Sequence, residues 1–475
     1  MKRTKIICTI GPASEDPKIL SKLVENGMNV ARLNFSHGTY ENHTKLMGTI
    51  RSVSSKLKIP VAILQDLQGP KIRVSDMPEP MPLKIGQSVV IGEDFTLDFD
   101  ITSSVKAKES VLIEDGLIEL LITKVNPSKP GKPHTGKIYC TVIAPGTVRS
   151  HKGINLPHSR ITFPILTNKD IQDLKFGLQS DVDYVALSFV RNVDDILNIK
   201  KLIKKYNPKG KEEPKVIAKI ERAEAVENFD SILREVDAVM VARGDLGVEM
   251  DDSQVPLIQK DLISKCAQAG KPVIVATQML DSMIRNPRPT RAEVSDVANA
   301  VIDRADAVML SGESAYGNYP VQAVSEMNRI IEATEASPYD DRIPSPIVGE
   351  SVEDKKASLI ARAVQRLTQG IEATAVIGTT ESGYTARFIS RERIAVPIII
   401  MTDRPKVYRQ MCLVWGINPL YVESLKALAN VEGLLSYFVA EAKRIKMVKK
   451  GQKVVLVAGN PLGERMNLVQ AVTVN

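Results

Sequence analysis

The chain has 475 residues, of which 43% are hydrophobic and 25% are charged, and this composition is typical of a globular protein with about three domains. The formal net charge of +7 is scattered along the chain, so it favours small anionic substrates and not nucleic acid. Four widely separated cysteines form no Cys-x-x-Cys pair, which argues against a zinc site or a disulfide framework. The first residues lack a signal peptide and no run approaches the ~18 apolar residues of a membrane span, so we expect a cytoplasmic protein without a membrane partner.

Eight short apolar segments alternate with helical segments in the first 311 residues. Strands that are apolar throughout and separated by helices indicate a parallel sheet covered on both faces. Eight such strands are the number that closes a (β/α)₈ TIM barrel. The predicted strands are 5–10, 29–36, 61–66, 184–189, 215–220, 238–242, 272–277 and 307–311.

A segment rich in proline and glycine, residues 70–165, interrupts the strands after the third one. Its short alternating patterns, as in 88–91 and 137–142, predict a small all-β domain, a β-barrel inserted in a loop of the larger barrel. A domain at this position could close over the mouth of the barrel as a lid. The barrel domain is then expected in two parts, residues 1–69 and 166–340.

Residues 341–475 restart the pattern and predict a separate C-terminal α/β domain. A helix is expected over 355–369, with strands over 373–378, 398–401 and 453–457. A turn between a strand and a helix in this domain could hold a phosphate through its backbone amides, although an ordinary capped helix start explains it equally well. The candidate effector residues in this turn are Thr379, Thr380, Ser382, Gly383 and Thr385.

Polar side chains gather at the carboxyl ends of the predicted barrel strands. In a barrel these ends meet at one mouth, where such enzymes place their chemistry. Strand ends are also polar simply because they reach the surface, but this does not account for Lys219 within a buried strand, two residues before Glu221 on the same face. The polar residues at these ends are Arg32, Asn34, Ser36, Asp66, Ser188, Lys219, Glu221, Arg243, Asp245, Thr277, Ser311 and Glu313.

The stretch Arg243-Gly244-Asp245 follows the sixth predicted strand. Gly244 permits a tight turn, and Asp245 stands where the strand gives way to a helix. A carboxylate able to hold a hard cation and unpaired backbone amides able to hold an anion would meet there. The same tripeptide is also an ordinary strand end and helix cap, so alone it leaves both interpretations open.

Ten ordered motifs across essentially the whole chain resemble those of pyruvate kinase. The resemblance implies a barrel, a β-domain inserted after its third strand and a C-terminal α/β domain, which is the layout that the pattern already indicates. It also implies a phosphotransferase that moves the phosphoryl group of phosphoenolpyruvate to ADP, giving ATP and pyruvate in the last step of glycolysis. The motifs are KIICTIGPAS, GMNVARLNFSHG, LQDLQGPKIR, HKGINLP, DYVALSFV, VIAKIERAEAVENFDSI, VMVARGDLGVE, ATQMLDSM, PTRAEVSDVANAV and LSGESAYGNYP.

The resemblance implies a divalent metal and a place for the substrate carboxylate. Glu221 and Asp245 would hold Mg²⁺, with Mn²⁺ as the alternative, because such cations take oxygen ligands. The backbone at Gly244 and Asp245, together with the hydroxyl of Thr277, would receive the carboxylate of phosphoenolpyruvate. Both assignments are known for the family, and the resemblance transfers them to the matching motif positions of this sequence.

The phosphoryl group and the enolate left behind by its transfer have their own implied partners. Phosphoryl transfer depends mostly on positioning and charge neutralisation. Lys219 would place its ammonium on the transferring group, and Arg32 would contact that group as well. The enolate must be protonated at carbon, either by Thr277 with a water or by a relay through Ser311 and Glu313, and the sequence does not choose between them.

The nucleotide is expected between the barrel and the inserted domain. By resemblance, Arg73 near the domain boundary and Lys152 in HKGINLP would reach the phosphates of ADP, while Asn34 and His37 line that side. Arrival of Lys152 from the lid gives a physical reason for closure before catalysis.

The chain departs from many relatives at the site of a monovalent cation. Their K⁺ ligands match Asn34, Ser36, Asp66 and a following Thr, but here Leu67 follows and supplies no side-chain oxygen. Those relatives then have Gly-Pro-Glu-Ile-Arg where this chain has Lys71 in place of the Glu. The hypothesis is that the ammonium of Lys71 replaces K⁺, so that K⁺ is not required. The alternative is that Lys71 points to solvent and K⁺ still binds.

Two other classes of function remain as alternatives: another metal-dependent barrel enzyme of phosphoenolpyruvate or pyruvate, such as a dikinase or an aldolase, and a catalytically inactive sensor. A dikinase needs a carrier histidine, yet the five histidines all lie in the first third of the chain and none is in a candidate carrier domain. An aldolase would not need the lid with Lys152. A catalytically inactive sensor would be expected to lack Lys219, Glu221 or Asp245, and all three are present. By resemblance the protein is also expected to form a homotetramer and to bind a small phosphorylated effector in its C-terminal domain, whose existence the sequence does not establish.

Overall fold

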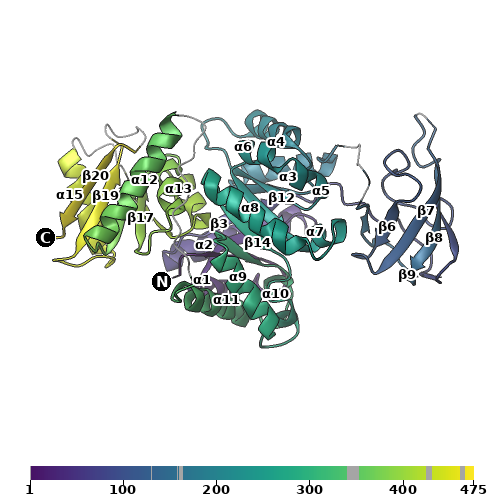
Figure 1. The fold of residues 1–475 in the computed structure, drawn as a ribbon, viewed down its shortest axis with the longest axis horizontal. Coiled ribbons are helices and arrows are strands. Elements are labelled where there is room, and N and C mark those ends of the chain that lie inside the picture. The colour runs from purple at the N-terminus through teal and green to yellow at the C-terminus, as the bar shows by residue number, and fades with distance from the viewer. Residues whose placement is uncertain are drawn as a thin grey trace.

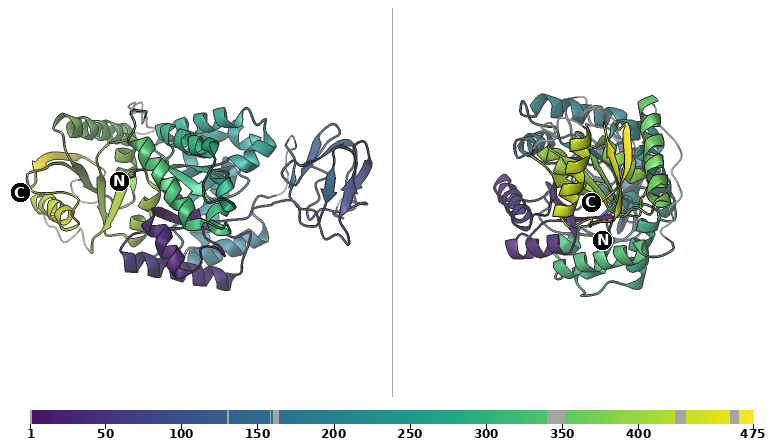
Figure 2. Two further views of the ribbon diagram at one scale, coloured as in Figure 1. Left: turned by 90° about the horizontal axis from the view of Figure 1, so that it is seen from below. Right: turned by 90° about the vertical axis from the view of Figure 1, so that its left-hand side faces the viewer.

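Three bodies lie in a row, with the barrel between the C-terminal domain and the inserted β-domain (Figure 1). Seen from below, the inserted domain stands away from the barrel and is joined to it by extended segments (Figure 2). The boundary expected at residue 340 lies outside the described residues. The computed structural model describes residues 2–129, 131–157, 159, 164–339, 352–423, 431–459 and 466–475.

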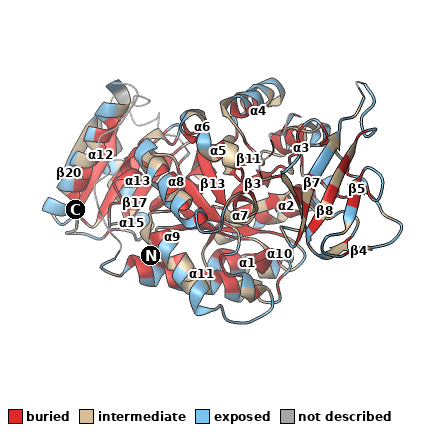
Figure 3. Cartoon of the chain, turned by 45° about the vertical axis from the view of Figure 1, so that its right-hand side comes forward, coloured by how far each residue is buried: buried red, intermediate tan, exposed pale blue. Residues whose placement is uncertain are grey.

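Eight parallel strands close the predicted (β/α)₈ barrel in the order β1-β15-β14-β13-β12-β11-β3-β2. Each strand is short and buried, because helices cover the outside of the barrel while side chains fill its interior (Figure 3). This confirms the fold class expected from the apolar segments. The strands are β1 (Lys5–Thr9), β2 (Met28–Asn34), β3 (Ala62–Asp66), β11 (Tyr184–Leu187), β12 (Lys215–Ile220), β13 (Ala238–Ala242), β14 (Val273–Ala276) and β15 (Ala307–Leu310).

Capping side chains fix where several barrel helices begin. The carboxylate of Asp16 caps α1. Reciprocal capping boxes begin two other helices: Thr167 with Asp170 at α3, and Thr290 with Glu293 at α9.

No helix in the described part of the chain is long and apolar enough to cross a membrane. The helices are α1 (Pro17–Glu25), α2 (Tyr40–Leu57), α3 (Asn168–Gln179), α4 (Val193–Tyr206), α5 (Ala223–Glu227), α6 (Phe229–Glu235), α7 (Arg243–Glu249), α8 (Val255–Ala269), α9 (Arg291–Ile302), α10 (Gly312–Ala315) and α11 (Pro320–Glu335).

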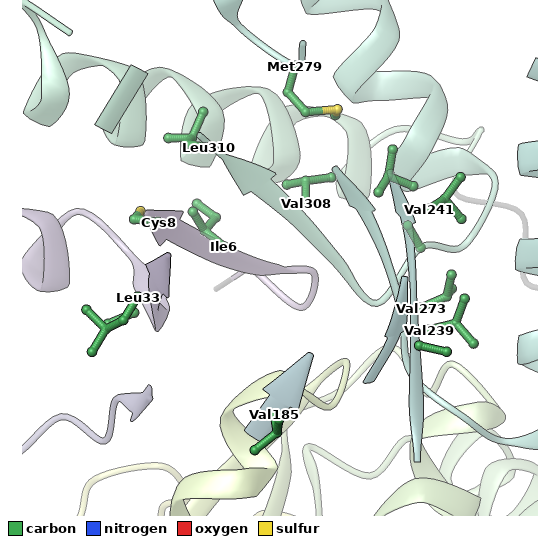
Figure 4. Close-up of a cluster of buried hydrophobic side chains, with 14 of the residues drawn as sticks. Ile6, Cys8, Leu33, Val185, Val239, Val241, Val273, Met279, Val308 and Leu310 are labelled. Carbon is green, nitrogen blue, oxygen red and sulfur yellow. The ribbon is translucent and has the colours of Figure 1, made fainter. Parts of the chain in front are cut away.

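Alternate residues of each barrel strand enter two separate apolar clusters. On β13, Val239 and Val241 point outward and pack under the helices, whereas Ala238 and Met240 belong to the cluster inside the barrel. Figure 4 shows the outward cluster, to which several neighbouring strands contribute. Because both faces of every strand are buried, the strand sequences are apolar throughout and do not alternate.

The inserted domain is all-β and has an apolar core of its own. Its strands form a five-stranded antiparallel sheet in the order β10-β6-β7-β8-β5 and a separate pair, β4-β9, rather than the single closed barrel expected for this segment. Its strands are β4 (Met81–Leu83), β5 (Ser88–Ile91), β6 (Ser110–Ile113), β7 (Ile118–Asn126), β8 (Lys137–Ala144), β9 (Gly146–Val148) and β10 (Ile154–Asn155).

The C-terminal domain is a five-stranded sheet, ordered β18-β17-β16-β19-β20, with helices packed on it. The sequence does not predict β18 or β20. Both are edge strands, and β18 contains Pro419, which edge strands tolerate but which hides a strand from a pattern search. The elements are α12 (Val352–Gly370), β16 (Ala375–Thr379), α13 (Tyr384–Arg391), β17 (Ile398–Thr402), α14 (Pro405–Gln410), β18 (Ile417–Tyr421), α15 (Val431–Arg444), β19 (Lys453–Ala458) and β20 (Leu468–Thr473).

The C-terminal domain closes the barrel at the amino ends of its strands. Leu413 joins the apolar cluster inside the barrel. Around this plug, Arg409 Nε contacts Asp183 Oδ1 at 2.7 Å, and Lys5 Nζ donates to the carbonyl of Ile417 at 2.7 Å. The closed amino ends leave the opposite, carboxyl ends as the open mouth.

Packing between α3 and β3 leaves no room for a side chain at Gly177. A Cβ there would lie 2.0 Å from Gln65 Oε1, and Gln65 is fully buried with Nε2 donating to the carbonyl of Asp173. We expect Gly177→Ala to lower the free energy of unfolding by about 1–3 kcal/mol, because Gln65 must shift. Chemical denaturation measures this change.

Gly48 provides the matched control for that substitution. It also lies inside a helix, α2, but a Cβ there would meet no atom within 4 Å. Gly48→Ala should therefore stabilise the protein by about 0.5–1 kcal/mol, since alanine loses less backbone entropy in a helix. Equal effects of the two substitutions would contradict the packing argument.

Candidate active site

A largely buried lysine, whose side chain is 12% exposed, lies in the barrel mouth. Lys219, on β12, places its Nζ 2.8 Å from Glu221 Oε1 and 3.4 Å from Asp66 Oδ1, and it donates to Ser188 Oγ at 2.7 Å. These residues come from three neighbouring strands, β12, β11 and β3. The structure thus brings together polar strand ends that are up to 155 residues apart in sequence, counted from Asp66 to Glu221.

A second cation shares Asp66. Arg32, on the adjacent strand β2, approaches Asp66 Oδ2 with both Nε and Nη2 at 2.7 Å, and its Nη1 donates to Thr9 Oγ1 at 2.8 Å. Asp66 is 1% exposed, so its carboxylate needs these partners to remain charged. Arg32 and Lys219 therefore point into the mouth from two sides of one carboxylate.

The pKa values of this cluster follow from burial and charge together. Burial would raise the pKa of the Asp66 carboxyl, but the charges of Lys219 and Arg32 hold it below its usual value. Burial opposes the charge on Lys219, yet the carboxylates of Asp66 and Glu221 keep the pKa of its ammonium above the ordinary value. The lysine is therefore a permanent positive charge at physiological pH.

Neighbouring cations do not fully balance the negative charges of Glu221 and Asp245. Burial raises the pKa of Glu221; Lys219 works against this, while the nearby charge of Asp245 adds to it. Oε2 of Glu221 accepts from the amide of Phe189 at 2.7 Å. The described residues contain no group of three or more His, Cys, Asp or Glu side chains that could hold a metal. Two carboxylates suit Mg²⁺, which usually keeps several waters and takes further oxygens from a substrate.

The stretch Arg243-Gly244-Asp245 does form the turn from strand to helix. β13 ends at Ala242, and Asp245 lies in the first turn of α7. The amide of Gly244 is not unpaired as the sequence suggested, because it donates to Thr277 Oγ1 at 2.8 Å. A substrate carboxylate in this place would have to replace that hydrogen bond.

Thr277 has a strained backbone at the end of β14. Its φ is +68°, a conformation that is unfavourable for a β-branched residue and that recurs at functional sites. Its carbonyl accepts from Arg243 Nη2 at 2.8 Å, and Arg243 Nη1 contacts Asp296 Oδ1 at 2.7 Å. Asp296 and the amide of Phe189 support the site and were missed from sequence, since Asp296 lies in helix α9 and Phe189 acts through its backbone.

Glu313 is placed differently from the relay expected for it. Its Oε2 accepts from the backbone amide of Ser311 at 2.7 Å, and its Oε1 accepts from the amide of Leu280 at 3.0 Å. Both contacts are to backbone, so the carboxylate holds two loops of the mouth together and does not touch the hydroxyl of Ser311. Burial raises the pKa of Glu313, and the hydrogen bonds from those amides oppose the rise.

The residues expected to bind the nucleotide are not gathered in this structure. Arg73 Nη1 donates to the carbonyl of His151 at 3.0 Å, and Lys152 pairs with Glu114 inside the inserted domain. His37 is exposed, and its carbonyl contacts the imidazole of His43. The inserted domain stands away from the mouth, which accounts for this separation (Figure 2).

The monovalent-cation region holds its residues in two groups. Asn34 Oδ1 accepts from the amide of Ser36 at 3.1 Å, close to the Asp66 carboxylate on the adjoining strand. Lys71 lies instead against the inserted domain, where its Cε is 3.1 Å from the position of a Cβ on Gly153. No ion pair joins Lys71 to Asp66 in the described ranges.

The turn in the C-terminal domain caps itself. Thr380 Oγ1 accepts from the amide of Gly383 at 2.9 Å, and Ser382 Oγ accepts from the amide of Tyr384 at 3.4 Å. Gly383 adopts φ +83° before α13, and Thr379 and Thr385 are buried beside it. Two of the amides that a phosphate would use are therefore already satisfied, which favours the ordinary helix start.

Two family descriptions match this chain, one over the barrel with its inserted domain and one over the C-terminal domain. The family "Pyruvate kinase, barrel domain" matches residues 1–324, and "Pyruvate kinase, alpha/beta domain" matches residues 358–472. A pyruvate kinase of Staphylococcus epidermidis is 41% identical, with 98% of this chain and 79% of the relative aligned, and one of Staphylococcus saprophyticus is 42% identical with the same coverage.

A solved structure agrees with the sequence matches. The crystal structure of a pyruvate kinase from Cryptosporidium parvum superposes with a TM-score of 0.89 at 35% identity, covering 100% of this chain and 96% of that one. Neither an aldolase nor a dikinase accounts for matches of this extent. The fold, the charged cluster at the barrel mouth and these matches together show that the chain belongs to the pyruvate kinase family of phosphotransferases.

Proposed function

We propose that this protein transfers the phosphoryl group of phosphoenolpyruvate to ADP, giving ATP and pyruvate. The observation that carries the proposal is Lys219, a charged lysine held between Asp66 and Glu221 at the barrel mouth. A phosphoryl group in transfer carries negative charge on its outer oxygens, and fixed cations in a water-poor site stabilise that charge strongly. Arg32 supplies the second such cation.

In this proposal the turn after β13 receives the other end of the substrate. The carboxylate of phosphoenolpyruvate takes the hydrogen bond that the Gly244 amide now donates to Thr277. Gly244 has no side chain, so the substrate can approach the backbone. The hydroxyl of Thr277 is oriented at this point by its donation to the carbonyl of Ala276 at 2.6 Å.

Glu221 and Asp245 are proposed to hold the divalent cation, Mg²⁺ or Mn²⁺. When bound, the metal supplies positive charge to the phosphoryl and enol oxygens. The protein's own share is to present two carboxylates from adjacent strands and to keep Glu221 oriented through the amide of Phe189. Burial raises the pKa of Glu221 and the nearby charge of Asp245 adds to the rise, and a bound cation would offset both effects.

The enolate left by phosphoryl transfer needs a proton at carbon. We favour Thr277 with a water as the donor, because both oxygens of Glu313 are engaged by backbone amides. Glu313 then serves as a positioning residue that fixes the loops beginning at Leu280 and Ser311. Ser311 keeps the alternative role in a relay.

Closure of the inserted domain is proposed to complete the nucleotide site. Lys152 now pairs with Glu114, and Arg73 binds the carbonyl of His151, so both cations must exchange these contacts for the phosphates of ADP. Lys152 and Glu114 are partly exposed, and an ion pair near the surface costs little to break, typically below about 1 kcal/mol. Asn34 and His37 would line the same side once the lid has closed.

We further propose that Lys71 replaces K⁺. In the open arrangement its ammonium lies by Gly153, next to Lys152 in the segment that must move with the lid. Closure would carry this segment toward the mouth and bring the lysine near Asn34, Ser36 and Asp66.

A cytoplasmic homotetramer with an effector at Thr379–Thr385 is also part of the proposed function, and it rests on the resemblance alone.

Lys219→Met should abolish ATP formation from phosphoenolpyruvate and ADP. The loss should be about a thousandfold or more, because the fixed charge opposite the transferring group disappears. A coupled assay of ATP formation measures the rate, and calorimetry with Mg²⁺ checks that metal binding is retained.

Lys215→Met is the matched control for that substitution. It lies on the same strand but at the closed end of the barrel, paired with Asp237 at 3.2 Å. Its catalytic rate should stay near that of the unmodified protein. Substantial activity in Lys219→Met would contradict the proposed role of this lysine.

Glu221→Gln and Asp245→Asn should each weaken binding of Mn²⁺, because each removes one anionic oxygen ligand. We expect the affinity for Mn²⁺ to fall by about tenfold or more. The paramagnetic resonance signal of free Mn²⁺ measures this affinity. Asp251→Asn, at an exposed carboxylate just beyond α7, should bind as tightly as the unmodified protein. Unchanged Mn²⁺ affinity in both site variants would place the metal elsewhere.

Activity should persist when K⁺ is replaced by tetramethylammonium, since a tethered ammonium needs no free ion. Lys71→Glu should make the rate depend on added K⁺, whereas Lys84→Glu, at an exposed lysine of the inserted domain, should not. Steady-state rates in the two salts measure both effects. If the steady-state rate of the unmodified enzyme collapsed in tetramethylammonium, replacement of K⁺ by Lys71 would be refuted.

A further inference from the structure

A small cluster of charged side chains joins the inserted domain to the two elements that carry Glu221 and Asp245. Arg222 follows Glu221 just beyond β12, and Glu249 closes α7, four residues and so about one helical turn after Asp245. Both Arg222 and Glu249 are buried. Helices α5 and α7 lie at the end of the barrel that faces the inserted domain (Figure 1). The cluster is therefore placed between the candidate metal ligands and the lid.

The chain that returns from the inserted domain to the barrel is bound to this cluster. We call residues 154–157 and 159 the return segment. The carbonyl of Ser159 accepts from Arg222 Nη2 at 3.0 Å, and the backbone of Leu156 hydrogen-bonds to the carboxylate of Glu249. Leu156 also belongs to the apolar core of the inserted domain, and Ser159 Oγ donates to Glu109 Oε2 at 2.7 Å. Arg222 and Glu249 thus connect barrel elements to the body of the inserted domain.

The cluster leaves several buried polar atoms without hydrogen bonds. Nε of Arg222 lies 3.7 Å from Glu224 Oε2, and its Nη2 lies 3.6 Å from Glu249 Oε2. Both distances are too long for a hydrogen bond. Among the described residues, Arg222 Nε and the Oε2 atoms of Glu224 and Glu249 have no hydrogen-bond partner. Such atoms are unfavourable when buried, so this cluster does not reach its best arrangement while the inserted domain stands away from the mouth.

The charge of the cluster is also incompletely balanced, because one guanidinium faces two carboxylates. Burial raises the pKa of Glu249 to about 7. The charge of Arg222 opposes this rise, whereas the charges of Glu224 and Asp245 add to it. Closer pairing of Arg222 with Glu224 and Glu249 would improve both the charge balance and the hydrogen bonding.

We propose that Arg222 is a positioning residue that couples movement of the inserted domain to the elements carrying the metal-binding carboxylates. In the open arrangement Arg222 holds the carbonyl of Ser159. Closure withdraws that carbonyl, and the guanidinium then pairs with Glu224 and Glu249, which requires a shift of only about 1 Å. This role rests on the proposed function, because it assumes that closure completes the nucleotide site.

The coupling concerns ADP more than phosphoenolpyruvate. Lys219 and Arg32 are fixed by Asp66 and by neighbouring barrel strands, so the phosphoryl end of the first substrate meets a preformed site. Lys152 and Arg73, which are proposed to bind the phosphates of ADP, move with the inserted domain. Loss of the link at Arg222 should therefore impair nucleotide binding selectively.

Hydrogen–deuterium exchange of the full chain tests the link without any need for catalysis. In Arg222→Met the amides of Leu156 and Ser159 should exchange about tenfold faster, because a hydrogen bond from a charged donor no longer holds the return segment on the barrel. Arg222→Lys retains a donor for the Ser159 carbonyl and should exchange at nearly the rate of the unmodified chain. Unchanged exchange in Arg222→Met would overturn the proposal.

Steady-state kinetics separate positioning from a merely structural contact. Arg222→Met should raise the KM for ADP by about tenfold and leave the KM for phosphoenolpyruvate unchanged, and Arg222→Lys should restore most of the loss. A general weakening of the fold would affect both substrates. Equal changes in the two KM values, or faster exchange with no change in the KM for ADP, would overturn the positioning role.

Arg51→Met is the matched control. Arg51 also binds a carbonyl and a carboxylate, through Nη1 to Val61 at 3.0 Å and through Nη2 to Asp183 Oδ2 at 2.8 Å, but at the closed end of the barrel. This variant should change neither KM nor the exchange of the return segment. An equal effect of Arg51→Met and Arg222→Met on the KM for ADP would contradict a specific role for Arg222.

Glu249→Gln keeps the test decisive if Arg222→Met does not fold. Glutamine has nearly the same size but lacks the charge that would attract Arg222 on closure, so the KM for ADP alone should rise. An unchanged KM for ADP in Glu249→Gln would overturn the proposal. If the unmodified chain forms no ATP, the proposed function fails, and the exchange rates still decide whether Arg222 holds the return segment.

Discussion

The chemistry of this fold depends on one constraint, which is that four largely buried charged groups must share the mouth of the barrel. Lys219 and Arg32 neutralise Asp66, and Lys219 also contacts Glu221, so no member of the cluster is buried without a partner of opposite charge. Removing one member of such a buried set typically costs about 3–5 kcal/mol, because the remaining charge is left uncompensated. The cluster is therefore held rigidly before any substrate arrives.

The arrangement of strands makes this rigidity possible. Each charged residue stands at or near the carboxyl end of a strand whose other positions are mostly apolar and buried. The opposite ends are plugged by Leu413 and tied by Arg409 to Asp183. The backbone beneath the cluster cannot shift without disturbing two apolar layers. Strain at Thr277 is tolerated for the same reason, since the surrounding barrel determines its backbone.

The groups that would have to move for the proposed closure lie outside the barrel. Lys152, Arg73 and Lys71 sit on or beside the inserted domain, which has a separate core and is joined to the barrel by extended segments. Their present partners are Glu114, a carbonyl and Gly153, contacts that are weaker than those within the barrel mouth. The division suits an enzyme in which one substrate meets a preformed site and the other is enclosed.

Sequence alone determined the eight barrel strands, because both faces of each strand are buried and the strands are therefore apolar until their last residues. For the same reason it identified Lys219, Glu221 and Asp66 as a group, since polar residues at the ends of parallel strands must meet. Only the tertiary structure decided what each group touches. The pairing of Gly244 with Thr277, the backbone contacts of Glu313 and the supporting roles of Asp296 and Phe189 depend on distances across the barrel that no local pattern encodes. The edge strand β18 is of the same kind, because its pairing with β17 is a tertiary contact and its Pro419 hides it from a local pattern.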